Sequence, residues 1–344
     1  MLSQADKQIT KFSTPNLEIP VLNTIRDTYK GGSCCVLTAS NEEALRMTGT
    51  LNRNGFRACL IQSNDGFNLY NLFEIRSFIQ MLGDGNRFPV ITRDRWEASI
   101  SAFLKRFSRS ASLPVCLNLF AAFDSVNPKK YLSDFIEFVR ESAYEDFISG
   151  GDNLIYVSTI HKAKGREFDS VYTLLDRYSL AEDMHRRALY VGMTRAKKSL
   201  YISCNTGILD EFASRGVVFK KDGAVYPESD EILLQFGHRD VFLGFFKDIT
   251  RLVSGLYSGC ELVPEGDFFL AVNGKRKNRV LKLSKAGSSA VKALTEKGFK
   301  LYRAEVRFIV YWKGTDSEDG EECLVVLPDL YFRKEKNEAG NLLS

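Results

Sequence analysis

The chain has 344 residues, of which 44% are hydrophobic and 26% are charged, so we expect a soluble globular protein of two or three domains. Its formal net charge of +4 is too small to indicate a nucleic-acid partner by itself. The seven cysteines show no C-x-x-C spacing, which argues against a zinc ribbon or a disulfide scaffold and favours a reducing cytoplasm. No apolar run approaches the roughly 18–20 residues needed to cross a bilayer, and the N-terminus lacks the apolar core of a signal peptide.

The first third of the chain predicts alternating strands and helices. Residues 1–30 are polar and contain two prolines, so we expect a lead-in arm or linker. A buried strand is predicted at 34–38 and a second strand at 58–62. Between them, Ser40 and Glu43 form the sequence pattern of a capping box that starts a helix. This order is typical of an open, mostly parallel sheet in an α/β fold.

The rest of the chain predicts a helical insertion, then further alternating strands and helices, and then a second domain. Residues 83–150 predict a mainly helical insertion within a domain that spans 31–205. Residues 206–240 are irregular and predict a linker, and 241–344 predict a smaller C-terminal α+β domain. The α/β elements expected after the insertion are strands at 154–159, 170–175 and 199–204 and a helix at about 184–196.

Positive charge is concentrated in the C-terminal domain. Between Val272 and Lys313 there are twelve Lys and Arg residues against two Glu residues. Aromatic residues are interleaved with them, at 299, 302, 308, 311 and 312, a combination that suits a polyphosphate backbone with rings for base stacking. The alternative is that the basic residues form only the solvated face of an antiparallel sheet. The residues that we expect to contact nucleic acid are Lys275, Arg276, Lys277 and Arg279.

Two segments carry the residue types of a ligand site. In YVSTIHKAKGREF, the predicted strand delivers Thr159 and His161 to its carboxyl end, where open α/β sheets bind ligands. Lys164 adds positive charge there, Gly165 permits close approach of the backbone, and Glu167 offers an acceptor for a hydroxyl group. In RRALYVGMTRA, Arg195 near the end of a helix has the planar fork that stabilises charge on a phosphoryl group.

These two segments resemble motifs V and VI of the UvrD/Rep-type superfamily 1 helicases. The matching stretches are STIHKAKGREFDSVY for motif V and RRALYVGMTRAKKSLYI for motif VI. CCVLTASNEEALRMTGTLNRNGFRACLI is similar to the motif IV region, and the following stretch, from Glu74 onward, to motif IVa. The resemblance covers about residues 31–82 and 150–205 and implies the second RecA-like domain, with helices on both faces of its parallel sheet.

The resemblance also implies specific roles. Arg195 would be the arginine finger on the γ-phosphate, and Gly165 and Glu167 would touch the ribose end of ATP. Thr159, His161 and Lys164 would face single-stranded DNA or couple it to the nucleotide. Two further residues of motif VI, Arg187 and Tyr190, would be internal supports of its helix.

Several departures from the family pattern limit what the chain can do. Ala39 stands where motif IV usually presents an arginine to the nucleotide, and the insertion at 83–150 is short. These residues contain no G-x-x-x-x-G-K-[ST] pattern, so ATP with Mg²⁺ would be held mainly by a Walker A domain supplied in cis or in trans. By itself the chain is expected not to hydrolyse ATP appreciably.

Two functional hypotheses follow from this pattern. The first is the carboxyl-terminal portion of an ATP-dependent DNA helicase, with single-stranded or partly duplex DNA and a Walker A domain as partners. The alternative is a non-catalytic nucleic-acid-binding or regulatory module derived from a helicase domain, which Ala39 and the missing phosphate cradle favour. No residue spacing predicts a metal site, and the cysteines in apolar strands are interpreted as core residues rather than nucleophiles.

Overall fold

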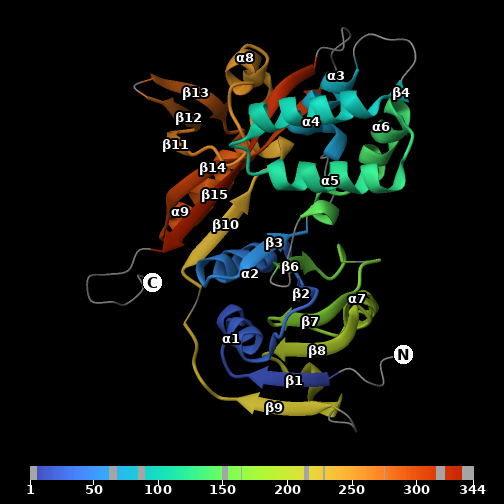
Figure 1. Ribbon diagram of the computed structural model, residues 1–344. Helices are drawn as coiled ribbons and strands as arrows, with labels where there is room; N and C mark the ends of the chain where they lie inside the picture. Colours follow the sequence, from blue (N-terminus) through green and yellow to red (C-terminus); the bar gives the residue numbers. More distant parts are fainter. Residues whose placement is uncertain are drawn as a thin grey trace. The chain divides into compact units, whose positions relative to one another are not determined.

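The computed structural model describes residues 6–61, 68–83, 90–148, 154–163, 165–212, 217–227, 229–274, 276–314 and 322–334 (Figure 1). The chain divides into two compact units. Unit 1 consists of residues 1–63, 150–233 and 333–343, and unit 2 of residues 64–149 and 234–332, with the last residue of the chain.

Unit 1 is built on a seven-stranded sheet with the order β3-β6-β2-β7-β8-β1-β9, in which every neighbouring pair is parallel. Its strands are β1 (Asp6–Phe12), β2 (Cys34–Thr38), β3 (Arg57–Leu60), β6 (Leu154–Thr159), β7 (Phe168–Leu175), β8 (Ala196–Cys204) and β9 (Val218–Asp222). The sheet confirms the predicted RecA-like parallel α/β fold.

Both faces of this sheet are buried. On β2, Cys34 and Val36 join one apolar cluster with α1 (Glu18–Thr28) and α2 (Asn41–Arg53), while Cys35 and Leu37 join a second cluster with α7 (Asp183–Met193). Figure 1 shows α1 and α2 on one side of the strands and α7 on the other. Because alternate residues of a strand point to opposite faces, burial on both faces explains why β2 is a continuous apolar run.

The predicted capping box starts α2. The amide of Glu43 donates to the Ser40 hydroxyl at 3.2 Å, and the Glu43 carboxylate accepts from the Ser40 amide at 2.8 Å. The same carboxylate accepts from the amide of Ala39 at 2.9 Å. The turn that follows β2 is therefore closed by its own helix cap.

The predictions of a lead-in arm at 1–30 and a linker at 206–240 are wrong for most of the described residues in these ranges. Residues 6–12 form β1, between β8 and β9, and α1 follows. Pro20 lies in the first turn of α1, where its missing N–H has no helical partner to lose, so it is compatible with a helix. Residues 218–222 form the edge strand β9, which needs only one neighbour and therefore tolerates a polar, lysine-containing sequence.

Unit 2 contains the helical insertion predicted at 83–150, and it also contains residues 68–82, which the sequence predicts as part of the α/β domain at 31–205. Its helices there are α3 (Phe73–Leu82), α4 (Arg93–Phe107), α5 (Leu113–Val126) and α6 (Leu132–Glu141), with single turns η1 (Leu69–Asn71) and η2 (Tyr144–Phe147) and a short ladder of β4 (Val90–Ile91) with β5 (Lys130–Tyr131). Their core is aromatic: Phe78 stacks on Phe120 at 3.8 Å between ring centres and meets Trp96, Phe103 and Phe135 edge-on.

Two antiparallel sheets complete unit 2. One has the order β10-β15-β14, from β10 (Glu231–Gln235), β15 (Glu322–Lys334) and β14 (Phe299–Lys313). The other has the order β11-β12-β13, from β11 (Leu262–Glu265), β12 (Phe268–Asn273) and β13 (Arg276–Lys282). The helices nearby are α8 (Thr250–Val253) and α9 (Lys285–Glu296), with the single turns η4 (His238–Asp240) and η5 (Leu243–Phe246).

The helical segment and the C-terminal sheets, which the sequence predicts as separate parts, share this unit. Glu74 of α3 is fully buried and accepts hydrogen bonds from the hydroxyls of Ser110, at 2.6 Å, and Ser258, at 3.1 Å. The guanidinium of Arg76 pairs with Glu322 of β15 at 2.7 Å. These contacts join residues far apart in the sequence, which no local pattern reveals.

Candidate functional site

The carboxyl end of β6 holds the first predicted site residues. Thr159 is paired with Thr38 in the sheet register and is only 7% exposed. Its carbonyl accepts from the amides of Lys162, at 3.1 Å, and Ala163, at 3.2 Å, which closes a turn. His161 lies in that turn with an exposed side chain. Thr159 therefore shapes the turn, and His161 is the residue that the turn presents to solvent.

The motif V loop continues with Gly165 and Glu167, while Lys164 lies outside the described residues. Gly165 has a φ of +87°, a backbone conformation that favours glycine, and no atom lies within 4 Å of the position its Cβ would occupy. Glu167 is exposed, and its carboxylate lies 3.8 Å from the Lys197 ammonium. The loop thus offers an open backbone turn next to an accessible carboxylate.

Arg195 follows directly after α7 and is half-buried against the motif V loop. Its Nε donates to the carbonyl of Val191 at 3.0 Å, and its Nη2 to the hydroxyl of Thr194 at 3.2 Å. Its Nη1 donates to the carbonyl of Arg166 at 3.3 Å. The backbone carbonyl of Arg195 accepts from the amide of Phe168 at 2.8 Å. Arg195 therefore joins motif VI to motif V through its side chain and its backbone.

All the hydrogen-bond partners of this guanidinium among the described residues are neutral. They are carbonyl and hydroxyl oxygens, and within the described residues no carboxylate forms an ion pair with Arg195. Hydrogen bonds from a cation to neutral oxygens are weaker than those to a phosphate or a carboxylate. The side chain is consequently held in place by contacts that an anion could replace.

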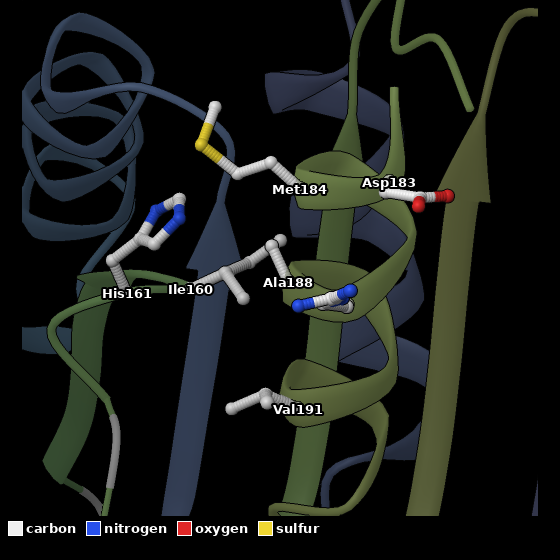
Figure 2. Close-up of a pocket in the computed structure, with 7 residues that line it drawn as sticks. Ile160, His161, Asp183, Met184, Ala188 and Val191 are labelled. Carbon is white, nitrogen blue, oxygen red and sulfur yellow. The ribbon is translucent and has the colours of Figure 1, made fainter. Parts of the chain in front are cut away.

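A pocket of about 440 Å³ lies between the turn after β6 and α7 (Figure 2). His161 and Met184 extend into the same space in this view. The floor of the pocket is apolar. The helix α7 approaches the sheet closely there, since a Cβ at Gly192 would lie 3.3 Å from Ile160 and 3.4 Å from Leu37. The residues that line the pocket are Ile160, His161, Asp183, Met184, Arg187, Ala188 and Val191.

The prediction that Arg187 and Tyr190 support the motif VI helix internally is wrong. Arg187 is exposed and lines the pocket, and Tyr190 is 68% exposed. The buried positions of α7 are Ala188, Leu189 and Gly192. Met184, Arg187 and Val191 follow a helical spacing of three and four residues, so this pocket-facing stripe was visible in the sequence as a periodic pattern.

The predicted basic residues belong to unit 2 and not to the unit that carries motifs V and VI. Arg276, Lys277 and Arg279 lie on β13 with exposed side chains, and Lys275 lies outside the described residues. The aromatic residues expected to accompany them are largely engaged elsewhere. Phe299 is only 6% exposed, and Phe308 and Tyr311 pack against Tyr144 and Phe73.

The cysteines in the strands are core residues, as predicted. Cys34, Cys35 and Cys204 are each at most 1% exposed. Burial raises the pKa of the Cys204 thiol to about 11, and it also raises the pKa of Cys35. Among the described residues, no group of three or more His, Cys, Asp or Glu side chains is arranged to hold a metal ion, and none of the helices has the length and apolarity to span a membrane.

Comparison with known proteins gives matches in the region that contains this site. Residues 154–203 match the family described as the UvrD-like helicase C-terminal domain. The RecB subunit of the RecBCD enzyme from Chlamydia muridarum is 32% identical over 83 residues, which cover 22% of this chain and 8% of RecB. DNA helicase II of Rickettsia typhi is 34% identical over 113 residues, covering 28% of this chain and 16% of the helicase.

The matched part of the chain thus spans a small share of each of these relatives. The family match nevertheless runs from β6 through β7 and α7 into β8, the elements that position His161, Glu167 and Arg195. Through these elements the chain is similar to the carboxyl-terminal half of UvrD/Rep-type DNA helicases.

Proposed function

We propose that unit 1 is the second RecA-like domain of an ATP-dependent DNA helicase and that it acts with a Walker A domain supplied in cis or in trans. In this proposal Arg195 is the arginine finger, and Gly165 and Glu167 contact the ribose end of the nucleotide. The observation that carries the proposal is the position of Arg195, whose guanidinium lies against the motif V loop on neutral acceptors alone.

The residues present fit one side of a nucleotide. A planar guanidinium suits a phosphoryl group, and the space beside Gly165 leaves room for backbone approach to a ligand. The contacts for Mg²⁺ and for most of the phosphates are assigned to the Walker A domain. The bound Mg²⁺ would neutralise charge on the phosphates, while Arg195 would stabilise the charge that develops during phosphoryl transfer.

The link between Arg195 and Arg166 suggests how nucleotide and DNA sites would communicate. When the guanidinium turns toward a phosphoryl group, it gives up its hydrogen bond to the Arg166 carbonyl. The loop that carries Arg166 also begins at the turn that presents His161. We propose that this release shifts His161 and Lys164, the residues assigned to single-stranded DNA, with Thr159 holding the base of the turn.

A second candidate function is a nucleic-acid-binding or regulatory module without catalysis. Ala39 favours it, because the position assigned to the motif IV arginine has no cation and its amide is bonded to Glu43. The two functions differ in one measurable property: only the first makes ATP hydrolysis depend on Arg195.

The test is DNA-stimulated ATP hydrolysis by the chain joined to a Walker A domain of the UvrD type. Arg195→Ala should lower the rate by about 10³-fold or more, the scale at which arginine fingers act. DNA affinity should change little. Arg186→Ala is the matched control, because Arg186 lies on α7, the helix that precedes Arg195, and its Nε also donates to a backbone carbonyl, that of Leu180. Hydrolysis that survives Arg195→Ala would exclude the finger and favour the non-catalytic module.

A further inference from the structure

The sheet β11-β12-β13 of unit 2 gathers cations on one of its faces. Phe268, Leu270 and Val272 alternate along β12, so they point to the same face of the sheet. Each lies opposite a basic residue of β13. These cross-strand pairs are Phe268↔Lys282, Leu270↔Arg279 and Val272↔Lys277. We call the surface formed by Lys277, Arg279 and Lys282 the basic face.

A β-bulge makes this arrangement possible. The register places Leu281 opposite Phe269 and Arg279 opposite Leu270, so Val280 is an extra residue in β13. Without that extra residue, Lys282 and Arg279 would point to opposite faces. Strict alternation instead puts Arg276 on the other face, so of the predicted residues that the structure describes, Lys277 and Arg279 belong to the basic face and Arg276 does not.

The basic face is accessible and carries a net positive charge. The side chain of Arg279 is 54% exposed and pairs with Glu265 of β11 at 2.7 Å. Lys277 and Lys282 form no ion pair with any acidic side chain in the described part of the chain. Apolar side chains next to them are also exposed, Val272 by 45% and Val263 by 37%. Such a mixture of cations and exposed apolar groups suits a ligand with both charged and flat apolar parts.

An aromatic ring borders the basic face. Phe242 is 50% exposed, and its amide donates to the carbonyl of Lys282 at 2.8 Å, which ties it to β13. The Lys282 ammonium lies 5.1 Å from the centre of the Phe242 ring and 5.2 Å from that of Phe268. Phe268 is covered by the Arg279 guanidinium at 4.4 Å, so Phe242 is the ring with the more open surface.

We infer that the basic face is a binding site for single-stranded nucleic acid, in which Lys277, Arg279 and Lys282 contact phosphates and one base stacks on Phe242. A row of cations beside an exposed ring matches a strand of alternating phosphates and bases, because phosphates need charge and every base has a face that stacks. An acidic peptide would use the cations but gain nothing specific from the ring. The site lies in unit 2 and does not depend on the function proposed for Arg195.

The charge contribution is tested by the salt dependence of binding to a fluorescent oligothymidylate of about 20 nucleotides, measured by anisotropy with the full chain. Each phosphate contact to a single strand contributes about 0.7 to the slope of log K against log salt. The triple change Lys277→Gln, Arg279→Gln, Lys282→Gln should therefore flatten the slope by about 2. Lys285→Gln, Lys292→Gln and Lys297→Gln together remove three exposed charges from α9 and its C-cap and should leave the slope nearly unchanged.

An unchanged slope in the first variant, or an equal loss in the α9 variant, would overturn the inference. His161→Ala, introduced separately, reports on the DNA contact proposed for unit 1. If His161→Ala binds the oligonucleotide normally while the triple variant does not, the DNA contact at His161 is excluded and the binding site on the basic face is supported. If His161→Ala binds weakly while the triple variant binds normally, the binding site on the basic face is excluded and the contact at His161 is supported.

The stacking contribution is tested at Phe242, which is half-exposed and can be replaced with little effect on the core. Phe242→Leu should weaken binding about ten-fold because it removes the flat ring, and Phe242→Tyr should restore it. With an abasic oligonucleotide of equal charge, wild type and Phe242→Leu should bind alike. Glu265→Gln frees Arg279 and should tighten binding. A loss in Phe242→Leu that is as large with the abasic strand, or no loss with either strand, would contradict base stacking.

Discussion

The two units hold their cations in opposite ways. In unit 1, Arg195 is half-buried, and each of its guanidinium nitrogens donates a hydrogen bond to an oxygen atom of Val191, Thr194 or Arg166. In unit 2, Lys277 and Arg279 are exposed on a strand. A guanidinium held at one place suits one charge at one position, as in phosphoryl transfer, whereas a row of exposed cations suits an extended polyanion. The difference indicates that charge alone does not assign a function; the way each charge is held does.

The largest effect is expected where geometry should matter more than charge. Arg195→Lys keeps the positive charge but loses the fork that makes hydrogen bonds from three nitrogens. We expect ATP hydrolysis with the Walker A domain to fall about 100-fold or more. Lys277→Arg on the basic face should leave oligonucleotide affinity within about two-fold, because phosphate contacts there need only charge. Equal sensitivity at both positions would remove the distinction between the units.

The buried and exposed sides of α7 should contribute differently to the stability of the chain. Leu189 is 5% exposed and packs in the core, whereas its neighbour Tyr190 is 68% exposed. Leu189→Ala should lower the free energy of unfolding by about 2–4 kcal/mol, and Tyr190→Ala by less than about 0.5 kcal/mol. Chemical denaturation of the chain measures both. If Tyr190→Ala lowered the free energy of unfolding as much as Leu189→Ala, Tyr190 would be an internal support of the helix after all.

A pH-dependent prediction concerns the buried carboxyl group of unit 2. Burial raises the pKa of Glu74, and the hydroxyls of Ser110 and Ser258 offset this only in part. Because the folded state holds this proton more tightly than the unfolded state, the contribution of Glu74 to stability should be fully present below its unfolded pKa and be lost as the pH rises through its folded pKa. Glu74→Gln keeps an acceptor for both hydroxyls and should raise the free energy of unfolding at pH 7, because it removes a buried charge.

Denaturation of wild type and Glu74→Gln between pH 4 and pH 8 measures this difference. The exposed Glu97→Gln on α4 is the control and should leave the pH dependence unchanged. If the two Gln variants respond alike, Glu74 does not titrate as its burial requires.

The smallest effect is expected at the motif V loop. Gly165→Ala adds a methyl group where no atom lies within 4 Å, so the cost is the strain of a φ of +87°, about 1 kcal/mol. Gly223→Ala is matched, because its surroundings are equally open and its φ is not positive. Thermal unfolding should show a lower stability for Gly165→Ala than for Gly223→Ala. Equal stability of both variants would show that the left-handed turn at Gly165 is not required.

Local patterns predicted the elements well where one face or both faces of a segment enter a core. The strand at 154–159 and the strand at 34–38 have the predicted bounds, and the cap at Ser40 forms as expected. Burial of the segment at 6–12 could not be predicted from its sequence, because its buried residues are two apolar side chains, Ile9 and Phe12, and the polar Thr10. Its identity as a strand depends on β8 and β9, which lie far away in the sequence.

The motif V and VI segments and the parallel α/β order around them could be recognised from the amino-acid sequence alone, because residue type and spacing express the chemistry and the periodic burial of single elements. The folded chain was needed to show that Arg187 faces a pocket, that Glu74 joins two distant segments, and that Lys282 shares a face with Arg279. Those outcomes depend on which elements pack together and on a one-residue bulge. Contacts between distant segments leave no periodic trace in the chain.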